Sequence, residues 1–239
     1  MLVNNRGKII VIEGSDGSGK KTQTKLIFER ALSKGLKVET LSFPRYGTPT
    51  GQKIKDYLNG KLGSLDEVDT KYIAKLYAED RLSVKPLMMN WLNEGKTIIL
   101  DRYTESNMAH QGGTFWRKGE QQVREMVEWI RKLEIEEMGL PESDLVIYLY
   151  LPVEWTIKAM EGERRVRDLH EQNAAHLIDT ENCYKWLADH YKNWKRIDCI
   201  RNNERITVEE TTDIIWKIAE PMFYSESVHS LGGDFAKSK

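Results

Sequence analysis

The 239-residue sequence predicts an α/β domain with a doubly wound, parallel, five-stranded β-sheet flanked by helices. The first observation is a β-branched run at 9–12 that ends in a glycine-rich turn and is followed by helix-like spacing of apolar residues. The second is the continued alternation of strand-like and helix-like segments, which is typical of βαβ units. The third is the uncharged and mostly apolar run at 97–100, since strands buried on both faces belong to parallel sheets.

The strands are predicted from short apolar or alternating runs that are bounded by Gly and Pro. Residues 37–43 alternate between apolar and polar side chains and stop before a proline. Residues 145–151 are almost continuously apolar and also stop before a proline, and 197–200 form a short last run. With 9–12 and 97–100, these runs make the five expected strands.

The helices are predicted from apolar residues at helical spacing, with glycine, proline or capping residues at their ends. Pro86 interrupts one segment, so a kink or two separate helices are expected there. Gly139 ends another, and Thr207 followed three residues later by Glu210 is typical of a capping box. The expected helices cover 20–34, 51–59, 65–93, 120–138, 155–162, 169–194 and 207–219, with a further helix after Tyr103 and a polar turn at 201–205.

The composition fits one such domain and excludes several classes of protein. Hydrophobic residues make up 40% of the chain, and 36 Lys and Arg balance 37 Asp and Glu, so nothing indicates a nucleic-acid binder. No stretch approaches the roughly 18 apolar residues of a membrane span, and the N-terminus lacks a signal-peptide pattern. Cys183 and Cys199 have no C-x-x-C spacing, which favours a reducing compartment. We expect a cytoplasmic protein without membrane or nucleic-acid partners, with one domain at 1–224 and a polar tail at 225–239.

The turn after the first strand has the spacing of a phosphate-binding loop. Gly14, Gly19 and Lys20 stand at the positions of that pattern. Successive backbone N–H groups and the start of a helix form a cradle for a polyphosphate, and glycines let the phosphate oxygens approach closely. We predict a nucleoside triphosphate ligand; a glycine-rich turn without a ligand is the alternative. The predicted contacts are Gly14, Ser15, Asp16, Gly17, Ser18, Gly19, Lys20, Lys21 and Thr22.

One position departs from that pattern. A Ser or Thr normally follows Gly-Lys, because its hydroxyl ligates the Mg²⁺ that bridges the terminal phosphates. Here the position is Lys21, and Thr22 follows roughly a quarter of a turn further around the helix. Thr22 therefore does not simply replace the missing hydroxyl.

Two further groups are expected near the phosphate cradle, because ligands of parallel sheets bind at the carboxyl ends of the strands. Arg45, in a Pro- and Gly-rich loop, is a candidate for binding an acceptor's phosphate, and a solvated loop arginine is the alternative. Tyr77 and Arg81 lie four residues apart on one helix face. A ring for stacking and a guanidinium for a carbonyl suit a nucleobase, although core and solvated roles are the ordinary alternatives.

The segment after the run at 97–100 is a second candidate for binding phosphates and their metal ion. Asp101 is placed to bind Mg²⁺ directly or through water, and Arg102 to neutralise phosphate charge; the alternative is a structural ion pair. Asn107, His110 and Gln111 are spaced to face one cleft, although a lone histidine is more often structural.

An arginine-rich segment at about 161–170 is predicted to be a small lid. Its guanidinium groups are suited to binding the equatorial oxygens of a transferring phosphoryl group. The alternative is a salt-bridged, solvated helix face, since acids balance the basic residues. The candidate catalytic residues there are Arg164, Arg165 and Arg167.

Five motifs in this order resemble those of the thymidylate kinases, a family of P-loop nucleoside monophosphate kinases. The motifs are E-G-S-D-G-S-G-K, F-P-R-Y-G-T, L-Y-A-E-D-R, D-R-Y-T-E-S-N-M-A-H-Q-G-G and the arginine-bearing lid. The resemblance implies a P-loop NTPase-type fold that transfers the γ-phosphate of ATP to dTMP in dTTP biosynthesis. It also implies Mg²⁺ as cofactor and a homodimer.

The resemblance further implies roles for particular residues. Lys20 and the loop amides would hold the donor phosphates, Asp16 would contact the acceptor's 3′-hydroxyl, and Asp101 would belong to the magnesium shell. Arg102 and the region of Arg45 would receive the dTMP phosphate. Tyr77 would stack on thymine, and Arg81 would reach its carbonyl.

Other positions take their meaning from the same resemblance. Because Gly17 stands where some members carry arginine, the lid would supply the catalytic arginines. Residues 202–205 would lie near the adenine. His110 stands where many members have a Tyr beside the 2′ position of the sugar.

The transfer needs no general base, because an acceptor phosphate with a second pKa near 6 is already largely dianionic at neutral pH. Catalysis then consists of in-line positioning and charge neutralisation. One alternative is a deoxynucleoside kinase, in which Glu13 would act as the base. Another is a P-loop module that binds nucleotide with weak or no phosphate transfer.

Overall fold

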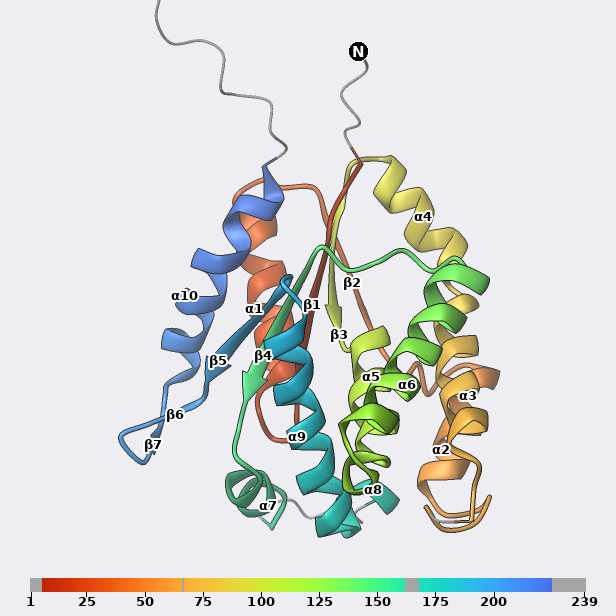
Figure 1. The fold of residues 1–239 in the computed structure, drawn as a ribbon. Coiled ribbons are helices and arrows are strands. Elements are labelled where there is room, and N and C mark those ends of the chain that lie inside the picture. Colours follow the sequence, from red (N-terminus) through yellow and green to blue (C-terminus); the bar gives the residue numbers. More distant parts are fainter. Residues whose placement is uncertain (1–5, 66, 162–167, 225–239) are drawn as a thin grey trace, which may run out of the picture.

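The computed structural model describes residues 6–65, 67–161 and 168–224, and it contains one five-stranded parallel sheet (Figure 1). The strand order is β2-β3-β1-β4-β5, so β1 lies at the centre of the sheet. The predicted doubly wound architecture is confirmed. The strands are β1 (Ile9–Gly14), β2 (Val38–Ser42), β3 (Thr97–Asp101), β4 (Leu145–Tyr150) and β5 (Trp194–Asp198).

Side-chain alternation along the strands divides the core into two parts. Ile9 and Val11 belong to the core on one face of the sheet, whereas Ile10 and Ile12 belong to the core on the other. All four side chains are fully buried, as expected for a central strand covered on both faces. Burying a side chain of this size stabilises the fold by roughly 1.5–3 kcal/mol.

The helices form a layer on each face of the sheet (Figure 1). On one face, α1 (Lys20–Ser33) packs against α10 (Val208–Ala219). The other face is covered by α4 (Lys85–Asn93), α5 (Thr104–Gly113), α6 (Glu120–Arg131) and α9 (Ala174–His190). A smaller apolar cluster joins α2 (Pro49–Leu58) to α3 (Thr70–Leu82) beside this layer. Short segments complete the described fold: η1 (Trp116–Lys118), α7 (Val153–Glu161), α8 (Leu169–Gln172) and η3 (Glu220–Phe223).

The strand register brings the predicted functional segments to one edge of the sheet. Ile12 of β1 pairs with Asp101 of β3, and Gly14 pairs with Leu149 of β4. The glycine-rich loop and the loop that follows Asp101 therefore leave the sheet side by side.

The division into two helices that was one of the expected outcomes at Pro86 is confirmed, and a second predicted helix is also divided. The segment predicted at 65–93 forms α3 and α4, and Pro86 lies in the first turn of α4, where its missing N–H costs nothing. The segment predicted at 120–138 begins at Glu120 as expected but continues after α6 as a π-helix, η2 (Lys132–Glu137). The chain leaves η2 through Gly139, which has a positive φ of 63°.

The last strand was placed too late in the sequence. The helix predicted to reach Trp194 ends at His190, and β5 begins at Trp194, whose indole packs into the core. The predicted polar turn is an antiparallel hairpin of β6 (Ile200–Arg201) and β7 (Glu204–Arg205). Its central asparagines, 202 and 203, have φ values of 52° and 60°, which a two-residue hairpin turn requires.

The C-terminal helix and its N-cap at Thr207 are confirmed, but the complete capping box is not. Thr207 accepts a hydrogen bond from the backbone N–H of Glu210, as predicted, while the Glu210 carboxylate pairs with Arg201. The predicted tail at 225–239 lies outside the described residues. Within the described part of the chain, no helix has both the length and the apolar character that crossing a bilayer requires.

Glu105 is a buried acid in the first turn of α5. It lines a cavity of about 350 Å³ and accepts a hydrogen bond from the Ser143 hydroxyl. Its Oε2 atom has no partner among the described residues. Burial raises the pKa of Glu105 to about 7.

Glu105→Gln should weaken the pH dependence of stability. The folded carboxyl keeps a proton that the unfolded carboxyl releases at lower pH, so wild-type stability falls as the pH rises towards 7. Between pH 5 and pH 8 the wild type should lose up to about 3 kcal/mol more than the variant. Urea unfolding at several pH values measures this difference. Glu128→Gln, at an exposed position of α6, is the control, and equal pH slopes for Glu105→Gln and wild type would contradict the expectation.

Candidate active site

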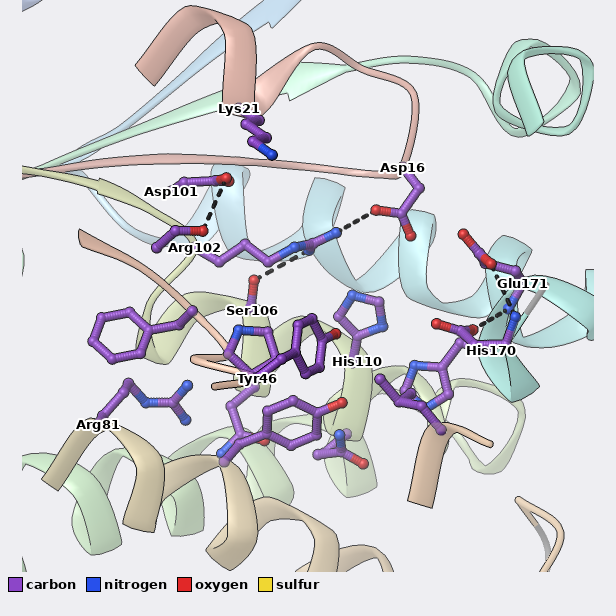
Figure 2. A pocket seen from close by; sticks show the side chains of 18 residues that line it. Asp16, Lys21, Tyr46, Arg81, Asp101, Arg102, Ser106, His110, His170 and Glu171 are labelled. Atoms are coloured by element: carbon purple, nitrogen blue, oxygen red, sulfur yellow. Dashed lines mark hydrogen bonds and ion pairs between the residues drawn. The ribbon is translucent and has the colours of Figure 1, made fainter. Parts of the chain in front are cut away.

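Two cavities open at the carboxyl edge of the sheet and share part of their walls. The loop cavity, of about 670 Å³, is lined by residues 16–23 of the glycine-rich loop and by the start of α10. The helix cavity, of about 430 Å³, is lined by α3, α5, α8 and the loop after β2 (Figure 2). Their shared residues are Asp16, Lys21, Asp101 and Arg102. Ligands in the two cavities would therefore meet at this rim.

The glycine-rich loop has the backbone geometry of a phosphate cradle. Gly14, Gly17 and Gly19 all have positive φ values, of 147°, 76° and 95°. A Cβ atom on Gly14 would lie 2.5 Å from the carbonyl oxygen of Leu149, so a larger residue does not fit there. Ser18 Oγ is buried and has no partner among the described residues. The loop thus contains a hydroxyl without a hydrogen-bond partner in the described part of the chain, in a residue that lines the cavity.

Lys20 is buried beneath this loop. Its ammonium group donates to the Ser15 carbonyl at 2.7 Å and lies 3.5 Å from the Asp16 carboxylate. Burial and the neighbouring Arg102 charge lower the pKa of Lys20 to about 8. The Lys20 ammonium group is therefore held in place, but its charge is only partly balanced by Asp16. Binding of an anion beside it is favoured.

Arg102 joins the glycine-rich loop to the loop after β3. Its φ of 66° lies in the left-handed region, which is strained for a residue with a side chain. The guanidinium pairs with Asp16 at 2.6 Å and also donates to Ser106 Oγ at 3.3 Å. Burial raises the pKa of Asp16, but Arg102 and Lys20 outweigh this effect and hold the pKa well below its usual range.

Asp101 and Lys21 lie together at the rim, as Figure 2 shows. Asp101 accepts a hydrogen bond from Ser42 Oγ at 3.2 Å, and Lys21 is exposed. Carboxylate oxygens are ligands that Mg²⁺ prefers, and Asp101 lines both cavities at their shared rim. Asp101 therefore fits a Mg²⁺ ion, whereas Lys21 supplies no oxygen ligand.

All five predicted residues from α3 and α5 line the helix cavity: Tyr77, Arg81, Asn107, His110 and Gln111. Three of them present buried polar atoms without a partner among the described residues, namely Asn107 Oδ1, His110 Nδ1 and Gln111 Nε2. Because unpaired buried groups are costly, a ligand with a polar edge that bonded these atoms would be stabilised in the cavity. Burial, followed by the charges of nearby His170 and Arg102, lowers the pKa of His110 well below its usual value, so its imidazole is neutral at pH 7.

Glu134 fixes the position of Arg81, and no local sequence pattern predicts this contact. The two side chains form a buried bidentate pair, with Nε–Oε2 and Nη2–Oε1 distances of 2.6 and 2.7 Å. Glu134 Oε1 also accepts from Asn107 Nδ2 at 2.8 Å. Glu134 lies in the π-helix η2, a type of segment that is often found at functional sites. Arg81 is therefore held at the cavity rather than solvated.

Arg45 does not line either cavity, contrary to the expectation from the sequence. Its guanidinium donates to the Asp80 carbonyl at 3.0 Å and to the Ser83 hydroxyl. Asp80 is buried, so it needs this cation and the additional bonds from the Arg45 and Thr50 donors. The neighbouring Tyr46 lines the helix cavity instead.

Glu13 lines neither of these two cavities. It is fully buried and accepts hydrogen bonds from Tyr103 N, Ser106 Oγ and Tyr184 OH. These contacts stabilise the start of α5 beneath Arg102. The position does not suit a base that must reach a substrate hydroxyl.

The short helix α8 contributes residues that were missed as site candidates. Asp168, His170 and Glu171 line the helix cavity. Asp168 and Glu171 form a capping box, and the D-x-x-E spacing was a readable signal for this helix start. Arg205 was also missed as a loop contact: it donates to the Gly17 carbonyl at 2.6 Å, because the β6–β7 hairpin folds against the loop. Arg164, Arg165 and Arg167 lie outside the described residues.

Comparisons with known proteins agree with this geometry. The family model for thymidylate kinase matches residues 12–210. The chain belongs to the thymidylate kinase family. It is 28% identical to human thymidylate kinase over 86% of this chain and 88% of that protein. Thymidylate kinase of Schizosaccharomyces pombe is 34% identical, covering 72% of this chain and 75% of its own. A solved thymidylate kinase from Candida albicans has the same fold, with a TM-score of 0.69 and 23% identity over 90% of this chain and 92% of that one.

Glu134→Gln should destabilise this member of the thymidylate kinase family by about 3 kcal/mol, because the Arg81 charge stays buried without its anion. Chemical denaturation measures the loss. Glu137→Gln, at an exposed position in the same π-helix, should be close to wild type. The double variant Arg81→Met with Glu134→Leu should recover much of the stability, since it removes both charges. A Glu134→Gln protein as stable as wild type would show that the pair contributes nothing.

Proposed function

We propose that this chain is a nucleoside monophosphate kinase that transfers the γ-phosphoryl group of ATP to dTMP. The observation that carries the proposal is the pair of cavities that share Asp16, Lys21, Asp101 and Arg102. One cavity has the form of a polyphosphate cradle, and the other presents buried polar atoms at helix faces. Two nucleotides bound in this way would bring their phosphates together at a cationic rim.

The loop cavity takes the donor. Loop amides and the Lys20 ammonium bind the β- and γ-phosphates, and Arg205 lies against the same loop. Asp101 is the residue that would hold Mg²⁺. When bound, the ion neutralises phosphate charge and orients the donor.

The helix cavity takes the acceptor. Its volume of about 430 Å³ lies within the usual range for small-molecule sites. Tyr77 offers a ring for stacking on a base. Arg81, Asn107 and Gln111 offer donors and acceptors for the edge of a pyrimidine, and Glu134 keeps the first two in place. Arg102 is then nearest to the acceptor phosphate at the shared rim.

The transfer step uses charge neutralisation rather than proton removal. An oxygen of the dianionic acceptor phosphate forms a bond to the γ-phosphorus, and the bond from that phosphorus to the β–γ bridging oxygen breaks, which leaves ADP. Lys20, Lys21 and Arg102 carry the positive charge that offsets the negative charge of the reacting groups. Arg164, Arg165 and Arg167, which lie outside the described residues, are proposed to add to this charge.

A deoxynucleoside kinase is the less favoured alternative, because the candidate base Glu13 is buried away from both cavities. A binding module without turnover is separated from the kinase only by assay. We also propose a cytoplasmic location and a homodimer; both stay predictions.

The decisive assay measures ADP release with ATP and Mg²⁺ against a panel of dTMP, dUMP, ribonucleoside monophosphates and thymidine, with the products identified by chromatography. The expected product is dTDP from dTMP, with little turnover of thymidine. Faster phosphorylation of thymidine would favour a nucleoside kinase. Tight ATP binding without turnover of any monophosphate would favour the binding module.

Lys21→Met should lower kcat roughly tenfold and change the KM for dTMP little, because the ammonium acts on charge at the rim rather than on the base. Lys21→Ser should lose less, since a hydroxyl at this position can ligate Mg²⁺. Steady-state kinetics at several Mg²⁺ concentrations measure both effects. Lys25→Met is the control, at an exposed position one helical turn away. An unchanged kcat in Lys21→Met removes Lys21 from the mechanism.

A further inference from the structure

Three histidines from three different helices meet at one wall of the helix cavity. They are His110 of α5, His170 of α8 and His176 of α9. One candidate ligand nitrogen from each ring lies within 4.8 Å of the others. His170 and His176 are each only 7% exposed. Figure 2 shows His110 and His170 at the side of the cavity nearest α8, where their ring centroids are 5.3 Å apart.

The spacing of the rings suits a shared metal ion. The other two centroid distances are 5.7 Å for His110 with His176 and 4.4 Å for His170 with His176. Three imidazoles on one tetrahedral ion, with metal–nitrogen bonds of about 2.0 Å, have ring centres roughly 5 Å apart. The candidate nitrogens lie within 4.8 Å of one another, whereas two ligands of one tetrahedral ion lie roughly 3.3 Å apart, so side-chain rotations would have to draw the rings together around the ion.

The hydrogen bonds of the three rings leave nitrogens for a metal. His170 Nε2 lies 3.1 Å from the Tyr57 hydroxyl, and His176 Nε2 lies 3.4 Å from Thr180 Oγ1. A histidine that ligates a metal through one nitrogen commonly uses the other to bond an oxygen in this way. His110 Nδ1 is buried and has no partner among the described residues. His110 therefore has a nitrogen without a partner in the part of the chain that the structure describes. His170 and His176 each have one nitrogen close to a hydroxyl oxygen, as is common for histidines that bind a metal.

We propose that His110, His170 and His176 bind a late first-row divalent cation such as Zn²⁺, and that this cation and the acceptor nucleotide exclude each other. Neutral imidazoles select Zn²⁺, Co²⁺, Ni²⁺ or Cu²⁺ over Mg²⁺, which prefers oxygen ligands. The site is thus chemically distinct from the Mg²⁺ position at Asp101.

The exclusion follows from the walls that the two sites share. His110 and His170 line the helix cavity, whereas His176 lies behind them and does not line it. A cation on the three rings would hold α8 against α5 and turn His110 towards the metal. This part of the proposal rests on the proposed function, because it takes the helix cavity as the acceptor site.

Cobalt is the probe for the metal site. The untagged chain is stripped with a chelator and titrated with Co²⁺ in the absence of nucleotide, and visible absorption is recorded. One Co²⁺ per chain with the intense absorption of a four-coordinate site is expected. His176→Leu should weaken binding at least tenfold, whereas His190→Ala, elsewhere on α9, should bind like wild type. Absence of the band in wild type, or equal binding by His176→Leu, overturns the site.

Folding is checked in the same samples. Circular dichroism tests whether His176→Leu is folded. If it is not folded, His170→Gln is the second variant, and it should also lose the cobalt absorption band. A band that His170→Gln retains also overturns the site.

The exclusion is tested by adding dTMP to the cobalt-loaded chain, with the binding of Co²⁺ to free dTMP measured separately and subtracted. Cobalt affinity should fall in proportion to dTMP concentration. An affinity that dTMP leaves unchanged overturns the exclusion. The titration without nucleotide tests the metal site even if the acceptor panel finds no kinase activity, so the two proposals fail separately.

Discussion

The ion pair between Asp16 and Arg102 joins the loops that follow β1 and β3. Parallel pairing of Ile12 with Asp101 brings those loops together, and the left-handed φ of Arg102 turns its side chain across the gap. Beneath the pair, Glu13 fixes the start of α5 through Tyr103 and Ser106. Since Asp16 and Arg102 line both cavities, this contact sets the geometry of both sites before a ligand arrives.

Much of the fold and the phosphate end of the site could be predicted from the sequence, because local patterns specify them. A β-branched run, spaced glycines and a lysine identify the cradle within a few residues. The charged pair at Asp101 and Arg102 follows an apolar run, and parallel-sheet geometry then places it beside the cradle. Where such patterns were incomplete, the observed elements differ from the predicted ones. Examples are the bounds of β5 and the hairpin around Asn202 and Asn203.

The rest of the site depends on partners that are far apart in the chain. Arg81 and Glu134 are separated by 53 residues, and no periodicity links them. Arg45 was expected at a phosphate, but buried Asp80, 35 residues away, engages it instead. The histidine cluster draws on α5, α8 and α9, and no local sequence pattern connects its three members. Tertiary packing, not local sequence, determines which partner each of these side chains contacts.

The two arginines at the ends of the helix cavity differ in how firmly they are held. Glu134, the partner of Arg81, is fully buried, whereas the Asp16 side chain that pairs with Arg102 is 36% exposed. Opening a buried pair costs several kcal/mol, whereas a partly exposed pair costs about 1 kcal/mol or less. Arg81 is therefore fixed before a ligand arrives, while Arg102 can leave Asp16 for the phosphate that we propose it binds. A fixed Arg81 suits the recognition of a rigid base. A more loosely held Arg102 suits contact with a phosphoryl group whose charge and bonding change during the reaction.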